Sequence, residues 1–306
     1  MQTTISHSVA AWLVGSVLCG VTSKQILSEI HCPYTLSALQ MTLAYICHAL
    51  WAAPRRSPET VLSESQEISL LFAALAFAIG VSCLNGGFEL MHVSISETLR
   101  ALEPLWTVSL AMTRLRRDAP VSRLRLVALG PIVLGVGLSA YHNASFRILG
   151  LAMVMVANIV FPIRSLLVKQ LQRALPLEHI FAATLLYGML FQWLGATVSL
   201  AFGGVRWIEL QPKHVLVGLL NGVSFYTYHR ASYSVLVATD MTTHAVVNAF
   251  RRVLTILFSF AYFGVPLAPG NALGMVVAGA GALLYARALR QERQDATDTI
   301  QAKDTV

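Results

Sequence analysis

The chain is divided into about ten long apolar stretches, and this pattern limits it to one class of fold. A helix needs about 20 mostly apolar residues to cross the hydrocarbon core of a bilayer. The stretches lie near 8–28, 33–53, 68–90, 93–113, 123–141, 147–168, 177–202, 212–234, 241–263 and 269–289. Short segments rich in Pro, Gly or charged residues separate them. The sequence therefore predicts an all-α membrane protein with ten transmembrane helices.

Composition and charge agree with this prediction. The 306 residues are 56% hydrophobic and only 12% charged, whereas a soluble domain usually carries about 25% charged residues. The net charge of +7 does not indicate nucleic acid, because most Lys and Arg lie in short loops. Ten helices place both termini on one side of the membrane. The loops and termini on that side carry twelve Lys and Arg residues, whereas the loops on the other side carry three. This positive-inside bias predicts cytosolic termini.

The two halves of the chain resemble each other around the fourth and ninth stretches. Residues 93–107 align without gaps on residues 241–255, and each segment is the fourth of five predicted helices. Matching polar interruptions in two halves are typical of a transporter's central site. Because five is odd, the halves would enter the membrane in opposite directions. We expect inverted repeats over 1–145 and 146–290, followed by a disordered cytosolic tail over 291–306.

Three arginines interrupt these two helices. An arginine at the centre of a membrane helix costs at least ~2.5–3.5 kcal/mol, so it usually faces a cavity or a partner. Arg100 is followed by Glu103 on the same helix face and by Pro104, which should bend the helix. Arg251 and Arg252 diverge by ~100°, so either one pairs with a carboxylate or both flank a ligand. The alternative is that these arginines lie at the membrane rim; a cationic pocket for small anions is the favoured interpretation.

Other polar residues have two interpretations each. Lys24 and Arg164 suit either a substrate site or an anchor at a helix end, and Tyr228 suits either a hydrogen bond to substrate or packing. Glu89 is a candidate for proton coupling. The sequence contains no phosphate-binding loop, no nucleophile–base motif and no metal-binding cluster. We therefore expect neither an enzyme nor a cofactor.

The motifs together resemble one family. They are Ser23-Lys24, Asn85, Ser94-Ile-Ser-Glu-Thr-Leu-Arg-Ala-Leu-Glu-Pro104, the set Asn158, Phe161 and Arg164, then Tyr228, and Thr243-His-Ala-Val-Val-Asn-Ala-Phe-Arg-Arg252. Over about residues 8–290 the chain resembles the sugar-phosphate/phosphate translocators (triose-phosphate translocators and relatives) of the drug/metabolite transporter superfamily. The resemblance implies that superfamily's fold.

The resemblance also implies roles for individual residues. By it, Arg100, Arg251 and Arg252 bind phosphate, although the family carries lysine at two of these positions. Secondary contacts to the substrate are assigned to Lys24, Arg164 and Tyr228. Supporting roles are assigned to Asn85, Glu103, Pro104, His244 and Asn248.

Two positions depart from the plastid members of that family. Those members carry a histidine and a threonine where this chain has Val81 and Leu84. The loss of both polar groups, and the lack of a plastid transit peptide before the first apolar stretch, favour the endomembrane relatives. We expect the Golgi or ER, with the plastid envelope less favoured.

The predicted function is antiport of a sugar phosphate or related phosphorylated metabolite against phosphate, by alternating access. The anion would bridge Arg100 of one half and Arg251 and Arg252 of the other. The only partners expected are this small anion and the lipid bilayer, with no nucleic acid; both a monomer and a homodimer are compatible. One alternative is a nucleotide-sugar/nucleotide monophosphate antiporter, in which Trp106 and Tyr226 would contact the base. Another is a membrane scaffold that does not transport.

Overall fold

The regular structure of the chain is helical throughout its described part. The computed structural model describes residues 2–52, 62–114, 122–141, 146–202, 211–238, 241–264 and 268–304. The first elements are α1 (Gln2–Ile30), α2 (Pro33–Ala52), α3 (Glu64–Leu90), α4 (Val93–Leu99), the short 3-10 helix η1 (Arg100–Leu102), α5 (Glu103–Arg114) and α6 (Arg123–Tyr141). They are followed by α7 (Ile148–Leu171), α8 (Leu177–Ala201), α9 (Pro212–Ala238), α10 (Met241–Phe263) and α11 (Pro269–Asp304). The predicted all-α fold is confirmed.

The helices have the length and the outer surface of a membrane protein. Within the described part of the chain, five segments are long and apolar enough to span a bilayer: Ser6–Ile30, Glu64–Leu90, Ile148–Leu171, Leu177–Ala201 and Pro269–Glu292. Helices outside this set also turn large apolar side chains outward, such as Leu134 of α6 (72% exposed) and Leu216 of α9 (69%). The ten-span count remains a prediction. The predicted repeat boundary also stays untested, because residues 142–145 lie outside the described part.

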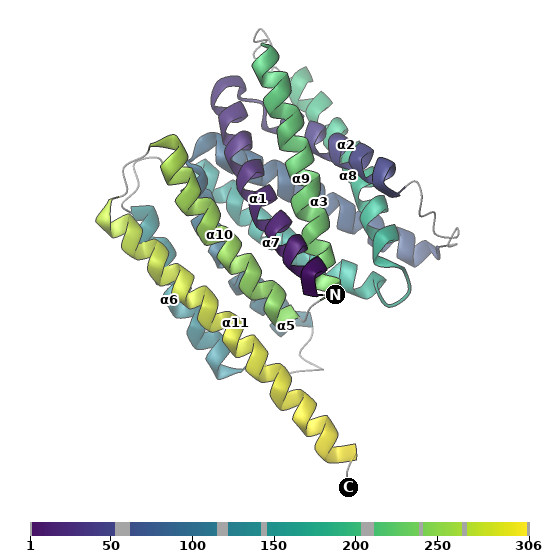
Figure 1. The fold of residues 1–306 in the computed structure, drawn as a ribbon, viewed down its shortest axis with the longest axis vertical. Coiled ribbons are helices and arrows are strands. Elements are labelled where there is room, and N and C mark those ends of the chain that lie inside the picture. The colour runs from purple at the N-terminus through teal and green to yellow at the C-terminus, as the bar shows by residue number, and fades with distance from the viewer. Residues whose placement is uncertain are drawn as a thin grey trace.

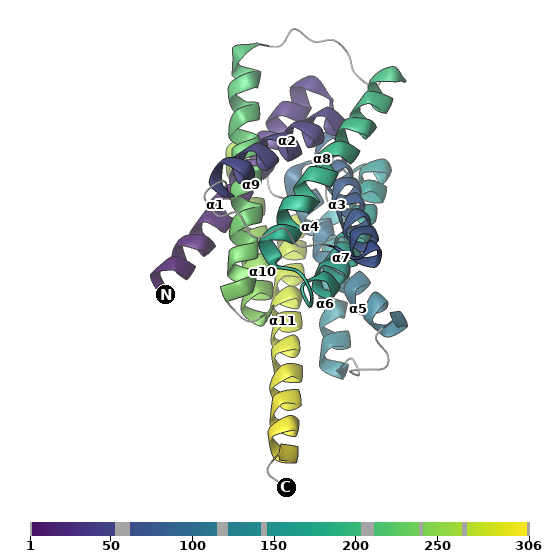
Figure 2. The same ribbon diagram turned by 90° about the vertical axis from the view of Figure 1, so that its right-hand side faces the viewer.

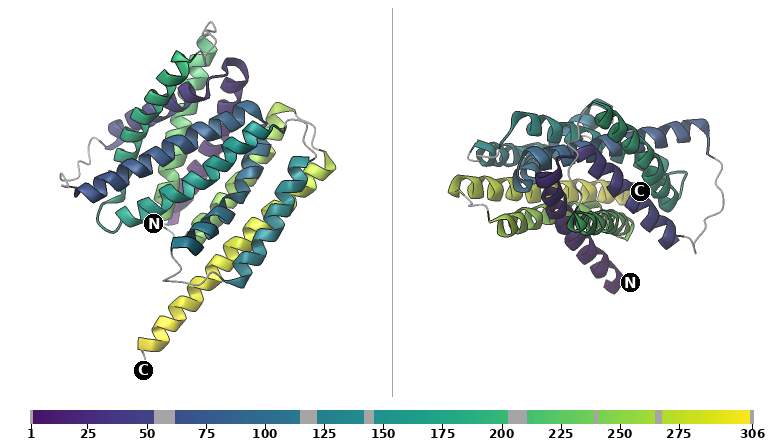
Figure 3. Two further views of the ribbon diagram at one scale, coloured as in Figure 1. Left: turned by 180° about the vertical axis from the view of Figure 1, so that it is seen from behind. Right: turned by 90° about the horizontal axis from the view of Figure 1, so that it is seen from above.

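Helices that are far apart in the sequence pack side by side. The most extensive contacts join α6 to α11, α3 to α7, α1 to α9 and α2 to α8. Figure 1 shows α1 beside α9 in one group, and α6 beside α11 in another, with α10 between them. The view from behind in Figure 3 shows the α6–α11 pair again. Each of these pairs joins the first half of the chain to the second.

The fourth predicted helix is interrupted, as Pro104 suggested. The proline has no N–H to donate to the Arg100 carbonyl four residues earlier, and the backbone tightens into η1, in which the Glu103 N–H bonds to that carbonyl. In a regular α-helix the Glu103 N–H would bond to the Leu99 carbonyl, so this carbonyl loses its helical donor. The side chain of Asn158 on α7 donates to it instead, at 2.9 Å. The interruption is thus held in place by a residue from the second half.

Two glycines allow α6 and α11 to approach each other closely. A Cβ added at Gly135 would lie 2.3 Å from the backbone nitrogen of Ala278, and one added at Gly274 would lie 2.5 Å from that of Ser139. The Ser139 hydroxyl also donates to Asn271 Oδ1 at 2.6 Å. Small residues with a buried polar bond are a common way to join helices within a membrane.

The predicted cytosolic tail over 291–306 begins within α11, which continues to Asp304. Figure 2 shows the end of this helix extending beyond the other helices. The first turn of the extension is held by Glu292, which pairs with Arg125 of α6 at 2.9 Å and accepts from the Ser122 backbone at 2.8 Å. A composition-based prediction could not include this long-range anchor.

Candidate anion-binding site

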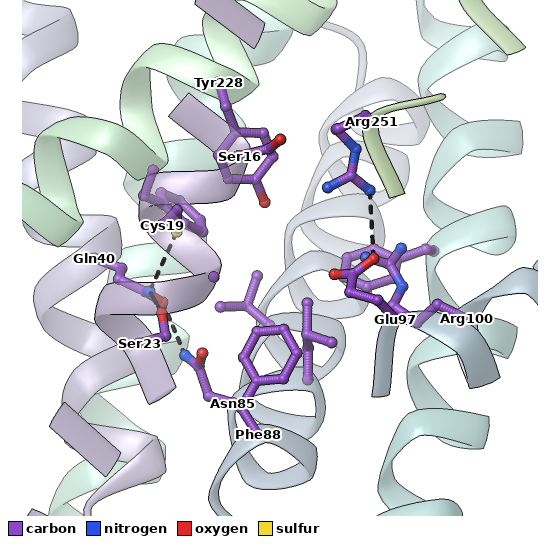
Figure 4. Close-up of a pocket in the computed structure, with 15 residues that line it drawn as sticks. Ser16, Cys19, Ser23, Gln40, Asn85, Phe88, Glu97, Arg100, Tyr228 and Arg251 are labelled. Atoms are coloured by element: carbon purple, nitrogen blue, oxygen red, sulfur yellow. Dashed lines mark hydrogen bonds and ion pairs between the residues drawn. The ribbon is translucent and has the colours of Figure 1, made fainter. Parts of the chain in front are cut away.

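A pocket lies at the centre of the bundle, where helices of both halves meet (Figure 4). One side carries charged groups, namely Glu97, Arg100 and Arg251, and the other carries neutral polar ones, Ser16, Ser23, Gln40 and Asn85. The remaining lining residues are Cys19, Gly20, Val81, Leu84, Phe88, Phe161, Phe225 and Tyr228. The pocket therefore has a charged wall facing a neutral wall.

Arg100 reaches the pocket from η1. Its Nη2 donates to Glu103 Oε2 at 3.1 Å, so the ion pair expected from their spacing is present. Its guanidinium carbon lies 4.8 Å from the centre of the Phe161 ring. Nε is buried without a hydrogen-bond partner among the described residues. A buried donor that is left free is costly unless a ligand or water takes it.

Arg251 reaches the same space from α10. Its Nε donates to Asn248 Oδ1 at 3.1 Å, which orients the guanidinium. Nη2 lies 3.9 Å from Glu97 Oε2, beyond hydrogen-bond distance. Figure 4 shows the guanidinium pointing toward Glu97 and Arg100. Arg251 is only 7% exposed, so its charge is largely removed from water.

Arg252 points elsewhere and does not line the pocket. Its Nη2 pairs with Glu103 Oε2 at 2.5 Å, and its Nη1 donates to the Arg100 carbonyl. In a regular helix that carbonyl would accept from the N–H of residue 104, which is absent because residue 104 is a proline. Of the two arrangements that the sequence allowed for the adjacent arginines, the structure has the first: one faces the pocket and its neighbour pairs with a carboxylate.

The neutral wall belongs to a buried network of amides and hydroxyls. Gln40 Nε2 donates to Asn221 Oδ1 at 2.8 Å and to Ser23 Oγ at 3.1 Å. Asn85 Nδ2 donates to Gln40 Oε1 and to Ser37 Oγ, both at 2.8 Å. These bonds join α1, α2, α3 and α9. Asn85 was expected from the sequence, but Gln40 and Asn221 were not, because single amides within apolar stretches gave no local signal.

Lys24 is not among the residues that line the pocket. Its Nζ donates to the carbonyls of Phe88, Glu89 and Met91, at 2.7, 3.3 and 3.0 Å. These carbonyls lie at the end of α3, where the last turn has no helical donors and a cation is favourable. Of its two interpretations, the structure favours the structural one for this lysine.

The other secondary residues divide between the pocket and its surroundings. Tyr228 lines the pocket, and a side chain at Gly15 of α1 would meet its backbone at 3.1 Å, so glycine permits this close approach. Arg164 lies outside the lining, 3.9 Å over the Phe77 ring and hydrogen-bonded to the Tyr233 hydroxyl. The His244 side chain lies outside the described part of the structure.

A sequence model described as the Triose-phosphate Transporter family matches residues 3–286. The chain belongs to this family. Its members are transporters, so this is a membrane transport protein and not an enzyme. Val81 and Leu84, the positions at which it departs from plastid members, both line the pocket.

Similar curated proteins carry consistent names. The rice protein named phosphoenolpyruvate/phosphate translocator 3, chloroplastic, is 30% identical over 94% of this chain and 75% of its own length. Phosphoenolpyruvate/phosphate translocator 2, chloroplastic, of Arabidopsis thaliana is 27% identical, over 91% and 75%. The spinach triose phosphate/phosphate translocator, chloroplastic, is 27% identical, over 90% and 69%. These names place the relatives in chloroplasts, so the expectation of a Golgi or ER location has no support from them.

A solved structure confirms the fold alone. A protein crystal structure superposes with a TM-score of 0.60, covering 91% of this chain and 97% of its own. Its sequence is 12% identical.

Proposed function

We propose that this transporter exchanges phosphate for a small phosphorylated metabolite across the membrane. The observation that carries the proposal is the pair of pocket-facing guanidiniums, Arg100 and Arg251. The buried Nε of Arg100 has no hydrogen-bond partner among the residues that the structure describes. Guanidinium–phosphate hydrogen bonds are strong and directional. A phosphoryl group between the two side chains would take up these donors. The relatives' names, which all describe exchange with phosphate, point the same way.

The charge around the site bears on how the carrier would close. Arg100, Arg251 and Arg252 have two carboxylates near them: Glu103, which pairs with Arg100 and Arg252, and Glu97, 3% exposed, beside Arg251. The formal charge of the five groups is therefore +1. An anion offsets this net positive charge and so favours closure of the loaded carrier.

Alternating access between two inverted repeats is supported by the way in which the helices pair. Exchanging the halves converts the α1–α9 contact into the α3–α7 contact and the α2–α9 contact into the α3–α8 contact. The α2–α8 and α6–α11 contacts convert into themselves. This is the pattern expected of a pseudo-two-fold axis between repeats. Arg100 belongs to one repeat and Arg251 to the other, so an anion between them would join both.

The nucleotide-sugar alternative needs a larger cavity and aromatic contacts to a base, for which the sequence offered Trp106 and Tyr226. Neither residue lines the pocket. In a scaffold that binds no anion, nothing would offset the free-energy cost of burying the guanidiniums of Arg100 and Arg251. Phosphate exchange therefore remains the function that the site supports best.

Counter-exchange in proteoliposomes tests the proposal. Vesicles preloaded with phosphate should take up labelled phosphate and phosphate monoesters, whereas vesicles preloaded with UMP or GMP, or left empty, should take up little. Uptake that needs internal nucleotide monophosphate would move the protein to the nucleotide-sugar class. Failure of folded protein to exchange any of these anions would overturn the proposal.

A further inference from the structure

Glu97 is an acidic side chain inside a pocket that otherwise suits an anion. It extends from α4, is 3% exposed, and lines the pocket together with Arg100 and Arg251 (Figure 4). Its Oε2 is buried without a hydrogen-bond partner among the described residues, and Arg251 Nη2 is 3.9 Å away. A buried carboxylate oxygen without a hydrogen bond is destabilising. A carboxylate kept at this cost needs an explanation in the site's function.

The charged groups that line the pocket carry a formal charge of +1, from two arginines and one glutamate. Nearby cations are engaged elsewhere. Arg252 bonds to Glu103 and to the Arg100 carbonyl, and Lys24 bonds to three carbonyls at the end of α3. Arg164 lies over an aromatic ring and bonds to a tyrosine. Within the described residues, the pocket offers cations for one phosphoryl group and none for a second anionic group.

The rest of the lining is neutral. Ser23, Gln40 and Asn85 form a wall of hydroxyl and amide groups opposite the arginines, and Val81 and Leu84 add apolar surface. This wall carries no charge, and the amide N–H groups of Gln40 and Asn85 are already used within the buried network. A carboxylate on the substrate would lose its hydration and would share the pocket with the negative charge of Glu97.

We propose that Glu97 sets which phosphorylated compounds are carried: it admits phosphate monoesters with an uncharged organic part and excludes phosphorylated carboxylic acids, including the phosphoenolpyruvate after which two of the relatives above are named. This inference rests on the proposed phosphate exchange and names its substrate class. Like charges within one partly buried pocket are destabilising. We expect discrimination of at least ~10-fold in half-inhibitory concentration between matched compounds, which corresponds to about 1.4 kcal/mol.

Two probes differ only in the group at issue. Glycerol 3-phosphate and 3-phosphoglycerate share a three-carbon chain and one phosphate, but a hydroxymethyl group in the first is a carboxylate in the second. Each is added as an inhibitor of labelled phosphate exchange in proteoliposomes. The wild type should be inhibited by glycerol 3-phosphate at a concentration at least ~10-fold lower. The methyl ester of 3-phosphoglycerate, which lacks the carboxylate charge, should inhibit as glycerol 3-phosphate does.

The variant Glu97→Gln keeps the size of the side chain and removes its charge. It should bring the ratio of the two half-inhibitory concentrations to about 3-fold or less, mainly because 3-phosphoglycerate becomes more potent. The matched control is Glu178→Gln, at a carboxylate that pairs with Arg230 at 2.6 Å and does not line the pocket. This control should keep the wild-type ratio.

The outcomes separate this inference from the proposed function. Equal inhibition of the wild type by the acid and by glycerol 3-phosphate would overturn the inference while phosphate exchange stands. An unchanged ratio in folded Glu97→Gln would do the same. If that variant does not fold, the comparison of the acid with its methyl ester on the wild type still decides. A folded wild type that exchanges no phosphate would overturn the proposed function itself.

Discussion

At the scale of single residues, three arginines that look equivalent in the sequence have different surroundings. Arg100 and Arg251 face the pocket, whereas Arg252 ties η1 to α10 through Glu103 and the Arg100 carbonyl. The pairing of Arg100 with Glu103 could be predicted because their spacing is local. The proximity of Glu97 to Arg251 could not be predicted, because it arises from packing between helices.

This division predicts effects of different size on stability for substitutions at the two neighbouring arginines. Arg252→Ala removes a buried ion pair with Glu103 and a side-chain donor to the Arg100 carbonyl, so we expect the free energy of unfolding to fall by about 3 kcal/mol. The melting temperature in detergent should fall by at least ~5 °C. Arg251→Ala should change the melting temperature much less, because Arg251 is not part of a close ion pair. Equal melting temperatures for the two variants would count against the structural role of Arg252.

Lys24 also has a structural role, for which the sequence left two interpretations. Lys24→Met leaves the carbonyls of Phe88, Glu89 and Met91 without their donor, and hydrogen bonds to a charged group contribute about 1.5–3 kcal/mol. We expect a lower melting temperature with an unchanged KM for phosphate. Measuring both on one preparation tests this, since a several-fold rise in KM would return Lys24 to the substrate site.

At the scale of elements, the sequence predicted helices well and their contacts poorly. Pro104 indicated the interruption of the fourth helix because the missing N–H is a local property. The side chain that bonds to the Leu99 carbonyl, Asn158, lies on another helix, so this role could not be predicted from the sequence. The end of α11 was missed because Glu292 is held by Arg125, 167 positions away in the sequence.

The α6–α11 contact offers a test with a matched control. Gly135→Leu places a side chain where even a Cβ would lie 2.3 Å from the Ala278 backbone nitrogen, so the helices must separate. Folded yield and melting temperature should both fall sharply. Gly137→Leu, at a position where a Cβ meets no described atom within 4 Å, should behave like the wild type. Similar yields from the two variants would show that this contact is wrong.

At the scale of the whole molecule, the match of residues 3–286 to a transporter family and the pairing of helices between halves give a consistent account. The inverted repeats were proposed from one short alignment of residues 93–107 on 241–255. The exchange pattern of helix contacts supports them independently. The substrate's charge class depends on Glu97 and on which cations are already engaged. No sequence pattern reports those contacts, because each joins residues on different helices.

The central claim is that Arg100 and Arg251 hold the exchanged anion, and labelled phosphate exchange by Arg251→Ala tests it most directly. The variant would be reconstituted in vesicles preloaded with phosphate, beside the wild type, after its melting temperature shows that it is folded. Loss of one member of a buried charged contact costs about 2–5 kcal/mol, so exchange should fall at least ~30-fold. Exchange at the wild-type rate would contradict the assignment of this pocket as the anion site.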